Sequence, residues 1–219
     1  MDRISWLREK RREAEDSYSR LWASTYDVEA DYPNASHLQF IQKFLQLFPQ
    51  NSLILDAACG TGRYMAHILE KGHSIVGIDQ AKGMLERARE KFPQVQLDNV
   101  GMQEMSFENV FDGAICMDAM EHVCPEDWTV IFGNFQRALK QGGYLYFTVE
   151  MQEEAEVKSA FEEAHAAGLP VVYGEWINTE VYHFYPALDQ VREWVQQAGF
   201  SIIEEDEGDM YHHFLMRKI

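Results

Sequence analysis

The sequence predicts a doubly wound α/β fold, in which an open and mostly parallel sheet has helices on both of its faces. The first indication is segment 53–63, where a short apolar strand runs into a loop of small residues and then into a helix. The second indication is segment 74–79, another apolar strand, which ends in the carboxylate of Asp79. Strands that alternate with helices in this way are typical of parallel sheets.

The region before the first strand is predicted to be helical. Tyr18, Trp22 and Tyr26 recur every four residues, which places them on one face of a helix. Residues 31–36 are rich in turn-forming side chains and predict a turn and an N-cap for a helix over 38–48. We therefore expect helices to precede the sheet.

The loop after the first strand has the composition of a nucleotide-binding turn. Ala57, Ala58, Gly60 and Gly62 keep side chains out of the turn, so backbone amides can approach a ligand closely at the helix N-terminus. The carboxylate of Asp79, at the end of the next strand, can accept hydrogen bonds from both hydroxyls of a ribose. The sequence thus predicts a nucleotide site at the carboxyl ends of these two strands.

The later elements continue the alternation and add an insertion. Apolar periodicity predicts helices over 80–92 and 128–139 and strands over 111–117 and 142–148. The insertion is predicted as a helix over 153–167 and an aromatic hairpin of strands 171–177 and 181–185, joined by 178–180. A helix over 187–198 and strands over 201–205 and 211–217 complete the predicted fold.

The glycine spacing of the first loop separates two cofactor classes. Dinucleotide-binding oxidoreductases use G-x-G-x-x-G, whose third glycine lets the helix pack closely on the strand. Here Gly60-Thr-Gly62 is followed by Arg63-Tyr-Met65, so that glycine is missing. The pattern of Asp56, Gly60 and Gly62 instead resembles the D-x-G-x-G-x-G loop of class I S-adenosylmethionine-dependent methyltransferases of the small-molecule type. Ala58 stands at the family's first glycine, which we expect to narrow the loop slightly.

This resemblance implies a Rossmann-like, seven-stranded sheet with a terminal antiparallel strand, and S-adenosylmethionine as cofactor with S-adenosylhomocysteine as product. At Met102 the family usually has an acid that holds the adenine amino group, so Met102 is expected to cover the adenine while Gln103 or a backbone group contacts its edge. The cofactor-binding residues that the resemblance implies are Tyr26, Asp56, Ala58, Gly60, Gly62, Asp79, Gln80, Met84, Met102, Gln103 and Met117.

The reaction implied by the resemblance is an in-line displacement of a methyl group from a sulfonium by a small organic acceptor. Alignment and exclusion of water supply most of the catalysis, and a base is needed only if the acceptor must lose a proton. The candidates for that base are Asp118, Glu121, His122, Glu150 and His183, of which Glu121 and His183 are our predicted catalytic residues.

Two alternatives to this mechanism stay open at the level of sequence. Asp118, Glu121 and His122 resemble the E-x-x-E-H cluster of metal-assisted O-methyltransferases, and on a helix the three would share one face. We favour a helix-capping role for Glu121 and His122 and predict no metal site. The other alternative is a non-catalytic module that only binds the cofactor.

The charge balance argues against a nucleic-acid acceptor. The chain carries a formal net charge of −17, and nucleic-acid binding depends on lysine and arginine contacts to phosphates. The basic cluster Arg8, Lys10, Arg11 and Arg12 alternates with acidic residues, which predicts a solvated, ion-paired helix face.

Length and composition predict one domain over residues 1–219. We divide it into an N-terminal helical cap (1–50), a cofactor-binding core (51–150), a lid insertion (151–186) and a terminal helix with a β-hairpin (187–219). The N-terminus has no apolar signal run and no segment reaches membrane-spanning length, so a cytoplasmic enzyme with no membrane partner is expected. The sequence leaves the oligomeric state open.

The cysteines and the terminal histidine pair have structural interpretations. Cys59, Cys116 and Cys124 are odd in number and lack paired spacing, which predicts reduced, mostly buried side chains. His212 and His213 are adjacent on a predicted strand, so they face opposite sides and cannot both enter one site.

Overall fold

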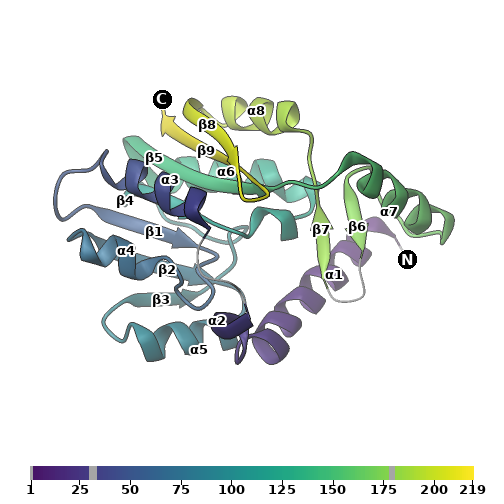
Figure 1. The fold of residues 1–219 in the computed structure, drawn as a ribbon, viewed down its shortest axis with the longest axis horizontal. Helices are drawn as coiled ribbons and strands as arrows, with labels where there is room; N and C mark the ends of the chain where they lie inside the picture. The colour runs from purple at the N-terminus through teal and green to yellow at the C-terminus, as the bar shows by residue number, and fades with distance from the viewer. Residues whose placement is uncertain (1, 30–33, 178–180) are drawn as a thin grey trace.

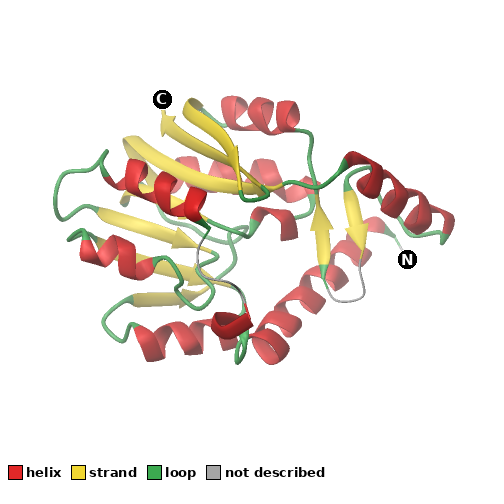
Figure 2. Cartoon of the chain, in the orientation of Figure 1, coloured by secondary structure: helices red, strands yellow, loops and turns green. Residues whose placement is uncertain are grey.

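The computed structural model describes residues 2–29, 34–177 and 181–219. Its centre is a seven-stranded sheet in the order β3-β2-β1-β4-β5-β9-β8, with helices on both faces (Figures 1 and 2). The strands are β1 (Leu53–Ala57), β2 (Ser74–Asp79), β3 (Gln96–Asn99), β4 (Phe111–Cys116), β5 (Leu139–Glu150), β8 (Phe200–Gly208) and β9 (Tyr211–Lys218). The first five strands pair in parallel, and β9 runs antiparallel to both of its neighbours, which confirms the predicted sheet.

The order of the strands in the sheet indicates where a ligand can bind. From β1 the chain winds outward through β2 to β3, and then returns to the other side of β1 to form β4 and β5. The carboxyl ends of β1 and β4 therefore flank the point where the winding reverses, which is where open α/β sheets bind ligands.

Two separate cores hold the helices to the sheet. On one face α3 (Ala35–Leu45), α4 (Met65–Glu70) and α5 (Lys82–Lys91) bury side chains such as Phe44, Met65 and Leu85. On the other face α6 (Pro125–Ala138) and α8 (Leu188–Gln197) bury Trp128 and Val191. Amphipathic helices on both faces explain why the central strands are apolar throughout.

The first helix, α1 (Arg3–Ser17), does not continue as predicted. Its chain widens into a single π-helical turn, Tyr18–Trp22, and a short helix, α2 (Tyr26–Glu29), follows. The expected single face of Tyr18, Trp22 and Tyr26 is therefore wrong, because the wider turn breaks the four-residue register. Tyr18 and Tyr26 still meet edge to face, with ring centres 6.4 Å apart, while the buried Trp22 Nε1 has no hydrogen-bond partner.

The start of α3 also differs from the prediction. The helix begins at Ala35, and the predicted turn lies partly at residues 31–33, outside the described residues. Asn34 occupies the N-cap position, but its side chain makes no capping hydrogen bond; the side chains of Asn34 and Ser36 instead donate to Asp209, in the turn between β8 and β9. A contact to a distant turn thus holds the position where α3 starts.

The insertion forms α7 (Glu154–Ala166) and a hairpin of β6 (Glu175–Ile177) and β7 (Tyr182–Phe184), which is shorter than predicted. The predicted connection at residues 178–180 lies outside the described residues. The hairpin is separate from the main sheet and lies beside α1 (Figure 1). Arg3 of α1 donates to both oxygens of the fully buried Glu175, each at 2.9 Å. The insertion and the first helix are therefore joined directly.

The cysteines and the two terminal histidines lie as the sequence predicted. Within the described residues all three cysteines are free, with Cys59 and Cys116 buried and Cys124 half-buried. His213 shares a hydrogen bond with Tyr146 on one face of β9, whereas His212 pairs with Glu205, so the opposite orientation of the two histidines is confirmed. None of the helices in the described ranges combines the length and apolar character that crossing a bilayer requires.

The first loop carries a conformational strain that the sequence analysis understated. Ala58 has a backbone φ of +55°, in the left-handed region that glycine tolerates and a Cβ does not. The expectation that alanine only narrows the loop is therefore incomplete, because this alanine also strains the backbone.

Replacing Ala58 by glycine should raise the free energy of unfolding by about 0.5–1 kcal/mol, the difference between relieved strain and the greater freedom of unfolded glycine. Urea unfolding measures this. The matched control is Ala57→Gly in the neighbouring strand, which should lower stability because that buried position is extended. A loss of stability in both variants would contradict the strain at Ala58.

Candidate functional site

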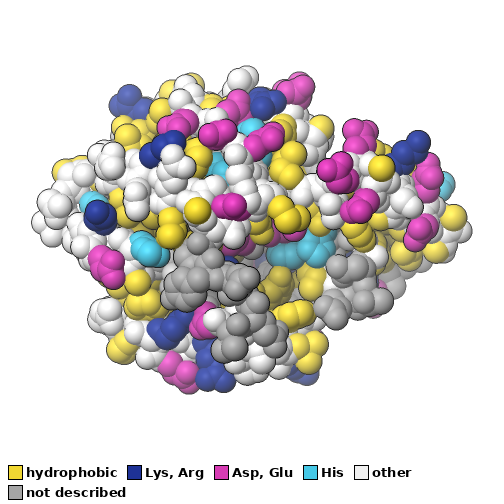
Figure 3. All heavy atoms as spheres, in the orientation of Figure 1, with side chains coloured by type: hydrophobic (Ala, Val, Ile, Leu, Met, Phe, Trp, Pro, Cys, Tyr) yellow, Lys and Arg dark blue, Asp and Glu magenta, His cyan; other side chains and the backbone are white. Residues whose placement is uncertain are grey.

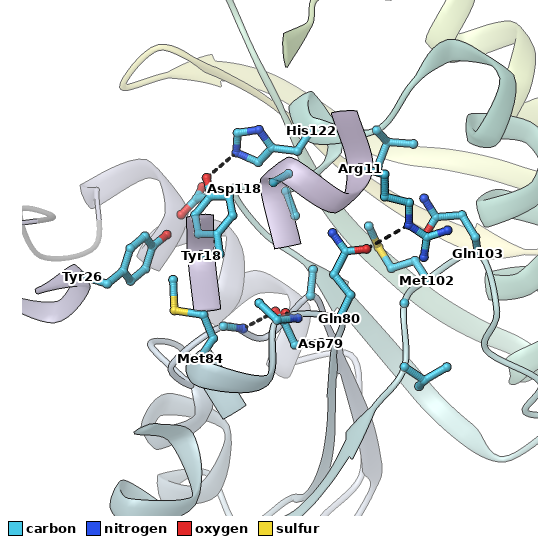
Figure 4. A pocket seen from close by; sticks show the side chains of 18 residues that line it. Arg11, Tyr18, Tyr26, Asp79, Gln80, Met84, Met102, Gln103, Asp118 and His122 are labelled. Atoms are coloured by element: carbon cyan, nitrogen blue, oxygen red, sulfur yellow. Dashed lines mark hydrogen bonds between the residues drawn. The ribbon is translucent and has the colours of Figure 1, made fainter. Parts of the chain in front are cut away.

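A pocket of about 760 Å³, partly open to solvent, lies at the carboxyl ends of β1, β2 and β4 (Figure 4). Figure 4 shows Tyr18 and Tyr26 on one side and Arg11, Gln80, Met102 and Gln103 on the other. The predicted cofactor residues that line it are Tyr26, Ala58, Gly60, Asp79, Gln80, Met84, Met102 and Gln103.

Asp79 forms the floor of the pocket. Its Oδ2 accepts a hydrogen bond from the Gly60 amide at 2.8 Å, and its Oδ1 accepts one from the Ala81 amide at 2.7 Å. Burial raises the pKa of Asp79 to about 6, against the lowering effect of these two amides. Each carboxylate oxygen has a further lone pair for a ligand hydroxyl. At Gly60 an added Cβ would meet no atom within 4 Å, so the loop is open on that side.

Three predicted cofactor residues lie behind the pocket wall. Asp56 is buried with its Oδ2 unpartnered, and burial together with the charge of Asp79 raises its pKa to about 8. A Cβ on Gly62 would lie 2.9 Å from the sulfur of Met65, so this glycine serves the packing of α4. Met117 is buried in one of the two cores. These three residues therefore shape the wall from behind and do not line the pocket.

The loop between β3 and β4 forms the far end of the pocket. The carbonyls of Met102 and Gln103 both accept hydrogen bonds from the side-chain amide of Asn134, at 2.8 and 2.9 Å. The Gln103 side chain donates to Asp127, at 3.1 Å. Because α6 supplies both partners, the loop is held against a rigid helix, and the Met102 thioether covers this end of the pocket.

Arg11 of α1 lines the pocket, which the sequence did not predict. Its guanidinium donates to both oxygens of Glu104 at 2.6 Å and to the side-chain oxygen of Gln80 at 3.0 Å. The prediction of a solvated, locally paired face is right for Lys10, which pairs with Glu13, and wrong for Arg11. No local pattern could have shown this, because the partner of Arg11 is distant in sequence.

Removing the Arg11 side chain should weaken the binding of S-adenosylhomocysteine by about two- to five-fold, since the pair with Glu104 is partly exposed and such pairs contribute little. Calorimetry measures the affinity. Arg12→Ala is the control, because it removes the same charge from an exposed position on the same helix. Equal weakening by both variants would mean that only net charge matters.

Asp118 follows β4 and reaches the pocket with a backbone φ of +50°. Its carboxylate accepts hydrogen bonds from His37 at 2.7 Å and Tyr64 at 2.6 Å. Burial alone would raise the pKa of Asp118, but these partners leave it lowered. The helix on which Asp118, Glu121 and His122 would share one face, as the metal-assisted alternative requires, does not form, since only Met120–His122 makes a 3₁₀ turn. In the described ranges no three His, Cys, Asp or Glu residues are arranged to hold a metal.

His122 connects the pocket to the insertion. Its Nε2 lies 2.8 Å from the Tyr18 hydroxyl and its Nδ1 lies 3.1 Å from the Tyr182 carbonyl. Burial lowers the pKa of His122 to about 4, so the ring is neutral and we assign Nδ1 as the donor to that carbonyl. The predicted helix-capping role is wrong for this residue, because its bonds go to the first helix region and to the hairpin.

Glu121 and His183 lie close to this histidine but outside the pocket lining. Glu121 is buried, its Oε2 has no partner, and its Oε1 lies 3.9 Å from His122 Nε2. Burial raises the pKa of Glu121 well above its ordinary value. The His183 ring lies 4.8 Å from the His122 ring and stacks on Tyr185. Figure 3 shows histidine and acidic side chains near one another at the centre of this face.

Comparisons with known proteins agree with this geometry. A family model described as a methyltransferase domain matches residues 54–143. A ubiquinone biosynthesis O-methyltransferase of Hydrogenovibrio crunogenus is 29% identical over 121 residues, which is 52% of this chain and 48% of that enzyme. The match thus spans about half the length of that relative. An uncharacterized methyltransferase of a Geobacillus strain is 22% identical over 83% of this chain and 87% of its own.

Among solved structures, the chain resembles the 1,6-didemethyltoxoflavin-N1-methyltransferase of Burkholderia thailandensis, crystallised with S-adenosylhomocysteine and its substrate. The TM-score is 0.73 at 16% sequence identity, over 96% of this chain and 89% of that one. At this identity the likeness establishes the shared fold.

Proposed function

We propose that this chain is a class I S-adenosylmethionine-dependent methyltransferase and that it transfers the methyl group of that cofactor to a small organic acceptor. The observation that carries the proposal is the floor of the pocket, where backbone amides hold Asp79 beneath an aromatic cover. When bound, S-adenosylmethionine supplies a methyl group on a sulfonium, which is already activated for displacement.

The residues present fit this cofactor. The carboxylate of Asp79 would accept the ribose hydroxyls, and the loop at Gly60 leaves open space for a close approach of the ligand. Met102 and the backbone of its loop would contact the adenine. The rings of Tyr18 and Tyr26 lie in the pocket wall, where their faces favour a cation through cation–π attraction.

The acceptor would enter from the side of the hairpin, where Glu121 and His183 lie beyond His122. Alignment of the two reactants is the main catalytic contribution that we assign to the chain, because the sulfonium needs no further activation. Arg11, Ala14 and Tyr18, from α1 and its π-helical turn, cover one side of the pocket and shield that side from water. Glu121 is the group that we assign to receive a proton when the acceptor has one to lose.

The proposal is tested by incubating the protein with S-adenosylmethionine and a fractionated extract of small metabolites, with release of S-adenosylhomocysteine as the readout. We expect release that depends on the extract and survives treatment with EDTA. Binding of the cofactor without turnover in any fraction would favour a non-catalytic module. Loss of activity with EDTA, restored by magnesium, would favour the metal-assisted mechanism.

The high negative charge and the narrow pocket support a small molecule and not a nucleic acid as the acceptor. The relative from Hydrogenovibrio is named for ubiquinone biosynthesis and the Burkholderia enzyme for 1,6-didemethyltoxoflavin, which supports the same class of acceptor.

A further inference from the structure

The carboxyl of Glu121 is buried without a matching charge. The residue is 3% exposed and its Oε2 has no hydrogen-bond partner. The nearest basic group is His122, whose ring is neutral because burial lowers its pKa to about 4. A buried carboxylate in this setting is costly unless a cation or a set of hydrogen-bond donors arrives to pair with it.

A second carboxyl lies near the first, because β5 contacts the 3₁₀ turn Met120–His122 that carries Glu121. Glu150 ends β5, the parallel neighbour of β4, and is half-buried. Its charge is the largest electrostatic influence on Glu121, and burial raises its own pKa. Within the described part of the chain, no lysine or arginine forms an ion pair with either glutamate. Arg63 lies 3.6 Å from Asp118 and over the Tyr26 ring.

Aromatic rings lie near the two carboxyls: Tyr211 is the strand partner of Glu150, and the Tyr18 ring contacts the ring of His122, which follows Glu121. Tyr18, Tyr185 and Tyr211 are largely shielded from solvent, which raises the pKa of each hydroxyl, and the charges of Glu121 and Glu150 raise these pKa values further. Aromatic faces and carboxylates together are the surroundings that stabilise a buried organic cation. An anionic acceptor would meet two like charges there, and a neutral one would leave the charge of Glu121 without a counter-charge.

We propose that the acceptor is an amine, and that Glu121 and Glu150 bind its ammonium group beside the cofactor pocket. This inference rests on the proposed methyl transfer and names the class of its substrate. The buried Glu121, whose Oε2 has no hydrogen-bond partner, and the half-buried Glu150 supply the negative charge, and the tyrosines supply the neighbouring rings.

The chemistry of an amine gives Glu121 a defined role. An ammonium nitrogen has no free lone pair, so Glu121 first takes one proton and becomes a neutral carboxylic acid. The nitrogen lone pair then forms the bond to the methyl carbon, while the electron pair of the carbon–sulfur bond moves to sulfur. The products are a methylated ammonium ion and neutral S-adenosylhomocysteine, and Glu121 returns its proton to water after they leave.

The test measures the binding of benzylamine, benzyl alcohol and benzoate to the protein saturated with S-adenosylhomocysteine. Wild-type protein should bind benzylamine at least about 10-fold more tightly than benzyl alcohol, and benzoate most weakly. Glu121→Gln and Glu150→Gln should each remove most of this preference while the affinity for S-adenosylhomocysteine stays unchanged. Glu193→Gln, on the exposed side of α8, is the matched control and should keep the preference.

Equal binding of benzylamine and benzyl alcohol by the wild-type protein would overturn the inference, as would a preference that survives in both variants. A Glu121→Gln protein that loses affinity for S-adenosylmethionine but keeps its affinity for benzylamine would assign the carboxylate to the sulfonium instead. These outcomes differ from failure of the proposed function, in which the protein would not bind S-adenosylhomocysteine at all.

Discussion

Replacing Asp79 by alanine should weaken the binding of S-adenosylhomocysteine by roughly 10- to 150-fold, which corresponds to about 1.5–3 kcal/mol. The variant loses the carboxylate proposed to accept the ribose hydroxyls. It also frees the amides of Gly60 and Ala81, which Asp79 holds at 2.8 and 2.7 Å. Calorimetric titration measures the effect, and circular dichroism shows whether the variant is folded.

Two comparisons separate the ribose contact from a general loss of structure. Asp98→Ala, on the neighbouring strand β3, removes the same charge outside the pocket and should leave the affinity within about two-fold. Burial raises the pKa of Asp79 to about 6, so in the wild-type protein the affinity should be full above this pH and fall below it, as the carboxylate gains a proton. A folded Asp79→Ala protein with normal affinity would refute the ribose contact.

Replacing Glu175 by alanine should lower the free energy of unfolding by about 3–5 kcal/mol. Glu175 is fully buried and accepts hydrogen bonds from Arg3, from the Tyr182 hydroxyl at 2.6 Å and from the Val172 amide at 2.6 Å. Its removal leaves a partly buried guanidinium, a buried hydroxyl and an amide without their acceptor. The remaining partners of Arg3 are Glu126 and the Pro170 carbonyl. Urea unfolding measures the loss.

Glu126→Ala is the matched control, because it removes the exposed partner of the same arginine. It should cost less than about 1 kcal/mol, since exposed ion pairs contribute little. If Glu175→Ala were no more harmful than Glu126→Ala, the contact between α1 and the hairpin would be peripheral. Because the two segments are distant in sequence, a large effect would show that they stabilise each other.

Local sequence patterns determined the sheet and the floor of the pocket. Alternating apolar segments predicted β1, β2, β4 and β5, since strands buried on both faces must be apolar along their length. The small-residue loop at Gly60 and the carboxylate of Asp79 were visible because each depends on its own neighbours. Strand β3 was missed, because it lies at the edge of the sheet and has a single apolar residue, Leu97.

The tertiary structure alone decided which side chains meet across the fold. Arg11 reaches Glu104, Arg3 reaches Glu175 and His37 reaches Asp118, and each of these pairs joins segments that are far apart in the chain. The four-residue spacing predicted that Tyr18 and Trp22 lie on one helix face. The π-helical turn Tyr18–Trp22 changes the number of residues per turn, so the two side chains do not share a face. A residue's backbone conformation depends largely on its neighbours along the chain, so pattern predicts it. The partner of a charged side chain depends on how distant elements pack against each other. The residues next to it in the sequence do not determine that packing, so they do not predict the partner.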